Sequence, residues 1–395
     1  EDGIRYSSTS RGLGDVYKRQ SQNSPFQTIN RAFDNVEPGD TIYVMDGTYT
    51  NPDYGTASPH SSDGSQSTNM NNPPAVIVNK SGTAGNYITL RNLPGHNPKI
   101  KFDGRGGILI NGPQSYLIIE GFEIEGPGAS ITYDQAIADR KWKVKADQED
   151  LNYNHSYFAS FGIWSGFSQD FLHHHVIIRN NIVHHTTGSG IRFNDSDHIT
   201  IENNTVYNTT WWTSNASSAI VFAECKALND NDNGDDIKMI MRGNTVYNNW
   251  NRIPFYMTSG KIPPNGNPPS GSYGNADYST ILDGQGLYVT RSDDDYYGTF
   301  LFENNLCVNI DIVYFISTNS TSNIRVAFGG ITPPAPLAPY ARSGGIINVA
   351  FDPTFNNEIP SSQPLITLPL PNSNSIGWFL SYDESNFVPL LNFPV

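Results

Sequence analysis

Three cations lie on or just beyond short apolar segments of the chain: Arg192, Lys226 and Arg291. A cationic side chain can hold a carboxylate, and a neutral amine can remove the proton from the adjacent carbon. These are the two requirements of β-elimination on a uronate sugar. Lys226 is the preferred base because it lies four residues before Asp230, where a metal ion could bind. Each cation could equally be an ordinary surface residue.

An acidic run, "NDNDNGDD", spans residues 229–236 and alternates side-chain oxygens around a glycine, as half of a calcium loop does. The expected cofactor is therefore Ca²⁺, and the candidate ligands are Asp230, Asp232, Asp235 and Asp236. Ile240 stands where the bidentate Glu of such a loop is expected. A solvated acidic turn explains the run equally well.

A carboxylate pair offers a different chemistry. Asp195 and Glu224 follow equivalent apolar segments, so stacking of those segments would place their backbones roughly 5 Å apart. Glycoside hydrolysis uses two carboxyl groups about 5 to 9 Å apart, and Asp283 could supply a third. The same pair could also be two hydrated turn residues.

Other side chains suit sugar binding, because aromatic rings stack on sugar rings and amides bind hydroxyl groups. The candidates are Trp164, Asn194, His198, Trp211, Trp212 and Tyr288. The consecutive histidines at 173–175 are expected to diverge and those at 184–185 to lie in a turn, and neither run has zinc-ligand spacing. A local Asp-His hydrogen bond is the simpler interpretation of His198.

Two families of segments must position these residues. The first reads "GILING", "GIWSGF", "GIRFND", "AIVFAE" and "GLYVTR", and each member precedes one of a second family: "IIEGFEI", "IIRNNIV", "TIENNTV", "IMRGNTV" and "LFENNLC". The shortest interval between equivalent positions is 23 residues, from Arg179 to Glu202. Short strands at such a period predict a solenoid whose coils stack as parallel strands.

This stacking makes three predictions about columns of side chains. Four asparagines should form a hydrogen-bonded ladder and also tolerate a left-handed turn: Asn181, Asn204, Asn244 and Asn305. Charged residues of the second family should alternate in sign and pair between coils. The outward positions of the first family should form one groove: Leu109, Trp164, Arg192, Val221 and Tyr288.

At this point the chain resembles the right-handed parallel β-helix proteins that include pectate lyases, alginate lyases and chondroitinase-B-like enzymes. The resemblance covers residues 24–309 and is carried by "SPFQTINRAFDNVEPGDTIYVMDGTY", the Asn-Asn phrases and "ILDGQGLYVTRSDDDYYGTFLFENNLCVN". It implies an all-β, right-handed single-stranded parallel β-helix with a short N-terminal capping helix. The family's motif of calcium aspartates and lysine has no residue-by-residue match here. One scaffold hosts lyases, hydrolases and binding proteins, so the fold does not fix the reaction.

The expected organisation has three parts. Residues 1–23 look like a disordered or non-native leader, residues 24–309 form the β-helix, and residues 310–395 form an irregular Pro-rich segment that is either truncated or made of divergent coils. Within residues 126–160 and 250–284, long insertions should flank the groove. A helix beginning after Ser24 should cap one end of the strand array.

The net charge of -14 argues against nucleic acid as the main partner, and the apolar runs are too short for membrane insertion. Two cysteines give no disulfide framework. We therefore expect a monomeric polysaccharide-degrading enzyme, secreted or located at the cell surface or in the periplasm. The leading hypothesis is a uronate-directed lyase acting on an acidic polysaccharide. The alternatives are a glycoside hydrolase and a noncatalytic carbohydrate-binding β-helix.

Overall fold

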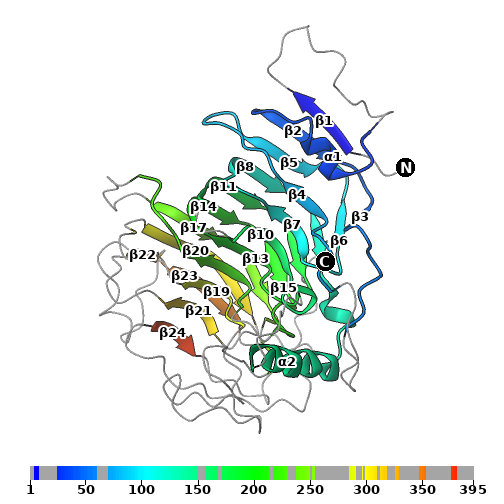
Figure 1. Ribbon diagram of the computed structural model, residues 1–395. Coiled ribbons are helices and arrows are strands. Elements are labelled where there is room, and N and C mark those ends of the chain that lie inside the picture. The colour runs from blue at the N-terminus through cyan, green and yellow to red at the C-terminus, as the bar shows by residue number, and fades with distance from the viewer. Residues whose placement is uncertain are drawn as a thin grey trace.

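The computed structural model describes residues 4–8, 25–59, 70–148, 156–167, 171–213, 217–229, 237–249, 251–253, 284–290, 296, 299–308, 312–317, 325–328, 347–352 and 375–379. Strands dominate this part of the chain and stack in successive coils (Figure 1). The strands form three parallel runs, which we call sheets 1, 2 and 3, and sheets 2 and 3 are joined through one long strand, β20 (Thr299–Val308).

Sheet 1 collects the strands of the first sequence family. In spatial order it contains β4 (Val76–Val78), β7 (Gly106–Ile110), β10 (Phe161–Ser165), β13 (Ile191–Asn194), β16 (Ile220–Ala223), β19 (Leu287–Thr290) and β21 (Ile312–Ser317), all parallel. The last strand, β24 (Ser375–Phe379), pairs antiparallel with β21.

Four members of the second family supply two strands each, and the fifth, "LFENNLC", lies within the single strand β20. Sheet 2 contains β2 (Asp40–Val44), β5 (Ile88–Asn92), β8 (Ser115–Glu120), β11 (His173–Arg179), β14 (Ser196–Glu202), β17 (Ile237–Arg242) and β20. Sheet 3 contains β3 (Thr48–Thr50), β6 (Lys99–Lys101), β9 (Glu123–Glu125), β12 (Ile182–His184), β15 (Thr205–Tyr207), β18 (Thr245–Tyr247) and the end of β20. The chain visits the sheets in this order in every coil, which confirms the predicted all-β parallel β-helix.

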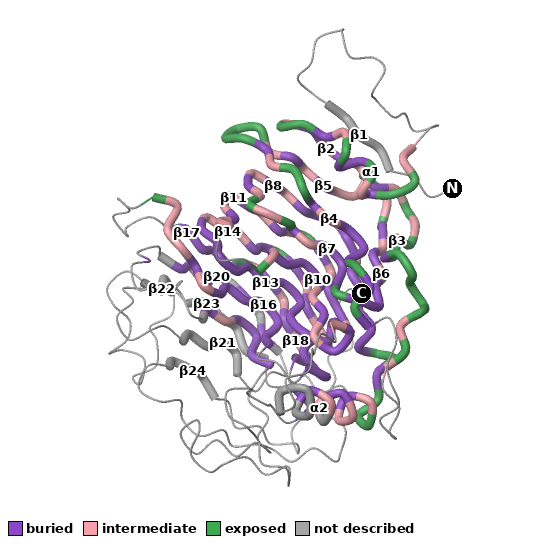
Figure 2. The backbone as a smooth tube through the Cα atoms, in the orientation of Figure 1, coloured by how far each residue is buried: buried purple, intermediate pink, exposed green. Residues whose placement is uncertain are grey.

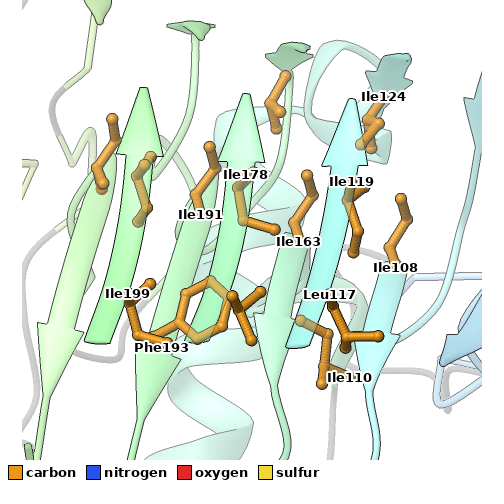
Figure 3. Packing of buried hydrophobic residues seen from close by; sticks show 14 of the residues in the cluster. Ile108, Ile110, Leu117, Ile119, Ile124, Ile163, Ile178, Ile191, Phe193 and Ile199 are labelled. Atoms are coloured by element: carbon orange, nitrogen blue, oxygen red, sulfur yellow. The ribbon is translucent and has the colours of Figure 1, made fainter. Parts of the chain in front are cut away.

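The core runs along the inside of the coils because alternate strand residues point inward. Ile108, Ile163 and Ile191 are in register on adjacent strands of sheet 1 and are fully buried (Figure 3). Leu117 and Ile119 of β8 face them from sheet 2. Buried backbone continues from coil to coil through the described part of the chain (Figure 2).

An asparagine ladder joins the coils between sheets 2 and 3, as predicted. Nδ2 of Asn181 donates to Oδ1 of Asn204 at 3.1 Å, and Nδ2 of Asn204 donates to Oδ1 of Asn244 at 3.1 Å. Asn244 continues the ladder to Asn305 at 2.9 Å. Each Oδ1 also accepts from the backbone N–H of the residue below it, so the buried amides are paired along the axis.

The prediction that the ladder asparagines adopt the left-handed conformation is wrong by one residue. The positive φ angles belong to the preceding column, which contains Gly121, Asn180, Asn203 and Gly243. Glycine and asparagine are the residues that tolerate this conformation most readily. The Asn-Asn phrase therefore divides two tasks between its members: the first residue turns the chain and the second bonds to the next coil.

The charged column of sheet 2 also pairs as predicted. Glu120 contacts Arg91 at 3.0 Å and Arg179 at 2.5 Å. In the next coils Glu202 lies 2.7 Å from Arg242 and 3.8 Å from Arg179. The outer surface at this column therefore carries acidic and basic side chains that pair between adjacent coils.

The predicted capping helix is present, but it begins later than expected. Helix α1 (Ile29–Phe33) has Thr28 as its N-cap rather than Ser24. Asn30 of this helix donates to the carbonyl of Ala75 at 3.1 Å and accepts from the N–H of Ile77 at 2.7 Å. The helix therefore covers the edge strand β4, whose backbone groups would otherwise be unpaired.

Strands also lie outside residues 24–309, the predicted extent of the β-helix. Strand β1 (Ile4–Ser8) lies within the predicted leader and pairs antiparallel with β2. Beyond residue 309, β21 continues sheet 1, and β22 (Arg325–Phe328) and β23 (Ile347–Asp352) pair parallel with β20. Parallel pairing thus extends into the segment predicted to be irregular.

The insertion before β10 contains an unpredicted helix, α2 (Tyr133–Gln148), with the short turns η1 (Pro127–Ser130) and η2 (Ser156–Phe158) on either side. Thr132 and Gln135 form a reciprocal capping box at its start. Beside it lies a second apolar cluster: Met70, Ile131, Ala136, Tyr157, Phe158, Trp211, Trp212 and Ile253. None of the described helices is long and apolar enough to cross a membrane. Cys225 and Cys307 are both buried and are not joined to each other by a disulfide.

Candidate functional site

The outward column of sheet 1 is stacked in register across five coils. Trp164 pairs with Leu109 on one side and Arg192 on the other, and Val221 links Arg192 to Tyr288. Trp164, Arg192 and Val221 are buried although they alternate with the core residues of their strands, and Tyr288 is half-buried. We call this set, with the strand-end residues described below, the sheet 1 site.

An aromatic group surrounds the first half of the column. Trp164 lies 5.7 Å, ring centroid to centroid, from Phe161, and Phe161 lies 5.7 Å from Phe167. The indole covers Gly106 of the adjacent strand, where a Cβ atom would lie 2.5 Å from Trp164 Cζ3. Glycine at this position therefore lets the indole lie flat against the neighbouring coil.

Arg192 lies beside this aromatic group. Its guanidinium carbon is 5.5 Å from the ring centroid of Phe167, within cation–π distance, and its Nε donates to Oδ1 of Asn194 at 3.1 Å. A guanidinium held in this way keeps its planar fork oriented, which suits recognition of a carboxylate.

Asn194 is fully buried and its backbone N–H donates to Ser165 Oγ at 2.7 Å. Its Oδ1 receives the Arg192 bond, whereas its Nδ2 has no hydrogen-bond partner within the described ranges. A buried donor without a partner is costly, by about 1–3 kcal/mol. A ligand oxygen would satisfy it.

The end of the site contains an ion pair. Lys226 follows β16 and its Nζ lies 2.6 Å from Oδ1 of Asp195, the residue after β13. Asp195 is almost fully buried and Lys226 is about a quarter exposed. The structure therefore joins the residue predicted as a lyase base to one predicted as a hydrolase carboxylate.

Asp195 and Glu224 occupy the same column, as predicted. Asn194 pairs with Ala223, and the N–H of Asp195 donates to the carbonyl of Ala223 at 3.2 Å. Both acidic residues have positive φ, 45° for Asp195 and 54° for Glu224. They mark the corner where each coil turns from sheet 1 to sheet 2.

Asp197, which the sequence analysis did not single out, holds the segment that carries Lys226. The fully buried carboxylate of Asp197 accepts from the N–H of Leu228 at 2.9 Å and from Tyr296 Oη at 2.9 Å. Burial opposes its ionisation, but hydrogen bonds from His198 and Leu228 outweigh it and lower the pKa of Asp197 below its usual value. The one sequence signal for Asp197 was its position two residues after the predicted site residue Asp195.

His198 lies on sheet 2, beside the sheet 1 site rather than in its column. Its Nδ1 is 3.2 Å from Oδ2 of Asp197, so the predicted local Asp-His interaction is present, with Asp197 as the partner. Its ring stacks on His175 with centroids 4.5 Å apart. The burial of His175 and the neighbouring imidazoles of His198 and His174 lower the pKa of His175 to about 4.

The prediction that the histidines at 173–175 diverge is wrong for His174 and His175, and the pair at 184–185 converges in the same way. Nδ1 of His174 lies 2.9 Å from Nδ1 of His175, and the same atoms of His184 and His185 are 2.7 Å apart. The second histidine of each pair has positive φ, 53° at His175 and 54° at His185, which interrupts the alternation of a strand. Their side chains therefore turn toward the preceding residue.

The structure places Trp211 and Trp212 away from the outward column. Both are buried in the second apolar cluster, and their indole N–H groups donate to the carbonyls of Asn248 at 2.9 Å and Gly128 at 2.7 Å. The Arg252 guanidinium carbon lies 3.4 Å from the Trp211 ring centroid. These contacts fasten loops at the corner between sheets 3 and 1.

The remaining predicted site residues lie outside the described residues: Asp230, Asp232, Asp235, Asp236, Asp283 and Arg291. Elsewhere in the described part, the metal-ligating side chains of Glu123, Glu125 and His184 converge on the surface of sheet 3. Lys99 Nζ lies 2.8 Å from Glu123 and 2.6 Å from Glu125, so the lysine ammonium occupies the position that a metal ion would take.

Comparison with known proteins adds little to this geometry. No protein-family model and no curated protein matches the chain. Among solved structures, it is similar to the crystal structure of pectate lyase Pel9A, with a TM-score of 0.39, 14% identity, and coverage of 88% of this chain and 72% of that one. A rhamnogalacturonan lyase matches with a TM-score of 0.28 and 12% identity over 77% of this chain and 81% of that one. At these TM-scores, the assignment of the fold stands on the strand pairing itself.

Proposed function

We propose that the chain is a polysaccharide lyase that cleaves a uronate polymer at the sheet 1 site. The observation that supports this most is the meeting of Arg192, Asn194 and the Lys226–Asp195 pair at the ends of β13 and β16. The site offers a cation for the substrate carboxylate, an amide donor and an amine for proton transfer, all beside aromatic rings.

In the proposed reaction, Arg192 pairs with the uronate carboxylate and Asn194 Nδ2 donates to the sugar. Lys226 first gives its ammonium proton to the solvent and then, as a neutral amine, takes the proton from the carbon next to the carboxylate. The electron pair of that C–H bond forms a carbon–carbon double bond, and the bond to the glycosidic oxygen breaks. That oxygen takes a proton from water. Arg192 stabilises the charge that develops on the carboxylate during proton removal.

Asp195 has a positioning role in this scheme. Its Oδ1 lies 2.6 Å from the Lys226 nitrogen, and Asp197 accepts a hydrogen bond from the backbone of Leu228, two residues after Lys226. A lysine side chain has several freely rotating bonds, so two such restraints reduce the entropy lost when the base meets the substrate.

Calcium remains part of the proposal. Asp230, Asp232, Asp235 and Asp236 would hold it with carboxylate oxygens, and it would add positive charge near the substrate carboxylate. Cleavage of a polymeric substrate also fits a monomer that acts outside the cytoplasm, at the cell surface, in the periplasm or after secretion.

A glycoside hydrolase is the second candidate, because Asp195 and Glu224 do share one column on successive coils. The Lys226 contact argues against it, since a carboxylate already bound by an ammonium is less available as an acid or nucleophile. The two reactions leave different products.

The test is incubation with pectate, alginate and glycosaminoglycans, with and without a chelator. Elimination leaves an unsaturated sugar that absorbs in the ultraviolet, and the proposal expects this absorbance with at least one acidic polymer. New reducing ends without the absorbance would establish hydrolysis instead. Glycan binding without either product would identify a noncatalytic carbohydrate-binding protein.

A further inference from the structure

The outer edge of sheet 2 carries a column of rings that the proposed reaction does not use. Tyr116 stacks on His175 with centroids 4.8 Å apart, and His175 stacks on His198. His174 meets Tyr116 and His175 edge-on, at 5.3 and 5.1 Å. The three imidazoles are all partly exposed to solvent.

The two nearest nitrogens in this column have the spacing of a chelate. His174 Nδ1 and His175 Nδ1 are 2.9 Å apart, and ligand nitrogens bind first-row metals at about 2.0 Å. At those distances the two nitrogens subtend about 90° at the metal, the angle between adjacent ligands in a square-planar or tetragonal site. A small rotation about χ2, which is a soft torsion in histidine, would direct both lone pairs to one point.

From this geometry we propose that His174 and His175 chelate a divalent transition-metal ion, and that Cu²⁺ is preferred over Ni²⁺ and Zn²⁺. This order of preference has two reasons. Nitrogen ligands generally bind Cu²⁺ more tightly than Ni²⁺ or Zn²⁺. An angle of about 90° between adjacent ligands also suits the tetragonal geometry of Cu²⁺ and not the tetrahedral geometry of Zn²⁺. Water completes the coordination. The proposal does not depend on the lyase reaction.

The state and surroundings of the rings suit this role. Metal binds the neutral imidazole. Burial and then His198 lower the pKa of His174, and the pKa of His175 is about 4, so both rings are neutral at pH 7. The stack between Tyr116 and His198 fixes the plane of His175, and Asp197 holds His198 in turn. Such outer contacts orient ligands in metal sites.

The second histidine pair has a similar Nδ1 spacing, 2.7 Å, but different surroundings. His184 is buried, its Nε2 lies 3.1 Å from Glu123, and its ring is stacked on Tyr207. His185 Nε2 lies 3.1 Å from Asn208 Nδ2. His184 is therefore less accessible to an ion from solvent than His174 or His175, and we assign the metal to the partly exposed pair.

The experiment is a Cu²⁺ titration of the untagged, metal-stripped full chain, followed by calorimetry and electron paramagnetic resonance. Excess Ca²⁺ fills any oxygen-ligand site beforehand. The variants are His174→Gln and His175→Asn, because asparagine tolerates the positive φ at position 175. His96→Gln is the matched control, a surface histidine whose Nδ1 is 2.9 Å from Asp46.

We expect one tight Cu²⁺ whose spectrum shows two nitrogen ligands. Each of the two site variants should weaken binding about tenfold or more, whereas His96→Gln should bind like the unmodified chain. Far-ultraviolet circular dichroism checks that each variant is folded. If His175→Asn does not fold, His174→Gln alone provides the test. Cu²⁺ binding of unchanged affinity and spectrum in folded His174→Gln would overturn the proposal, as would the absence of tight Cu²⁺ in the unmodified chain.

Discussion

The ammonium of Lys226 lies 2.6 Å from the carboxylate of Asp195, across two coils of the β-helix. The two residues are 31 positions apart in the sequence and meet because Asn194 and Ala223 pair on adjacent strands. This contact places the key groups of the lyase and hydrolase hypotheses in one site. Substitution of each partner separates the two reactions.

Asp195→Asn should reduce elimination about tenfold while leaving uronate binding nearly unchanged, because a neutral amide holds the Lys226 nitrogen in position less firmly than a carboxylate does. The measurement is kcat and KM for the unsaturated product, with Asp46→Asn as an exposed control. If the variant instead loses a hydrolytic activity that produces no ultraviolet absorbance, Asp195 acts as a hydrolase carboxylate.

Arg192→Met should weaken binding of an acidic oligosaccharide by about 10- to 100-fold, because a hydrogen bond to a charged group contributes roughly 1.5–3 kcal/mol. Arg192→Lys should restore part of the loss, since it keeps the charge but lacks the planar fork. Calorimetric titration with acidic and neutral oligosaccharides measures both effects. An equal loss for the two sugars would assign Arg192 a packing role at Phe167 rather than charge recognition.

The asparagine ladder makes a stability prediction that is independent of function. Asn204→Ala removes the acceptor of the Asn181 N–H and Nδ2 groups; the buried N–H is left without a partner, whereas Nδ2 keeps its bond to the carbonyl of Ile119. We expect a loss of about 2–4 kcal/mol in the free energy of unfolding, measured by urea denaturation. Asn203→Gly is the matched control, because glycine keeps the left-handed conformation at the adjacent position. Equal stability of the two variants would refute the ladder's role.

The sequence was informative wherever a repeated phrase fixed the register. Once Asn181 and Asn204 are aligned, the two-residue alternation of strands determines which side chains share a column, and this placed Trp164, Arg192 and Val221 correctly. The sequence did not distinguish the strands of sheet 3 from those of sheet 2, because sheet 3 strands such as β12 contain only three residues and directly follow the asparagine turn.

Other features depended on conformations that the residue types do not reveal. Histidine at a positive φ is uncommon, so nothing in "HHH" predicted that His174 and His175 would converge. Helix α2 has no apolar stripe, and the capping box at Thr132 and Gln135 was its one clear signal. Trp211 and Trp212 are residue types that are common in sugar-binding sites, but here their indole N–H groups donate to backbone carbonyls of neighbouring loops.

Stability should fall in acid because histidines are held neutral in the fold. Burial lowers the pKa of the fully buried His173 to about 4, and His175, which faces His174, His198, Asp197 and Tyr116, also has a pKa of about 4. Their ordinary value is 6.5, so the unfolded chain binds protons first. This contribution is complete above pH 6.5 and is lost as the pH falls toward 4.

Urea unfolding between pH 7 and pH 4 measures this effect. His175→Asn should give a shallower decline than the unmodified chain, whatever its stability at pH 7, because one protonating group has been removed. His96→Gln should keep the full slope, since that histidine is on the surface beside Asp46. An unchanged slope in His175→Asn would show that the stacked imidazoles do not contribute to acid unfolding.

The most direct test of the central claim, elimination at the sheet 1 site, is the rate of unsaturated product formation by Lys226→Ala on a uronate polymer that the unmodified chain cleaves. The variant should bind the polymer with nearly the same affinity and form product about a hundredfold to ten-thousandfold more slowly, since base catalysis contributes about 10²–10⁴. A Lys226→Ala protein that forms product at the unmodified rate would contradict the account.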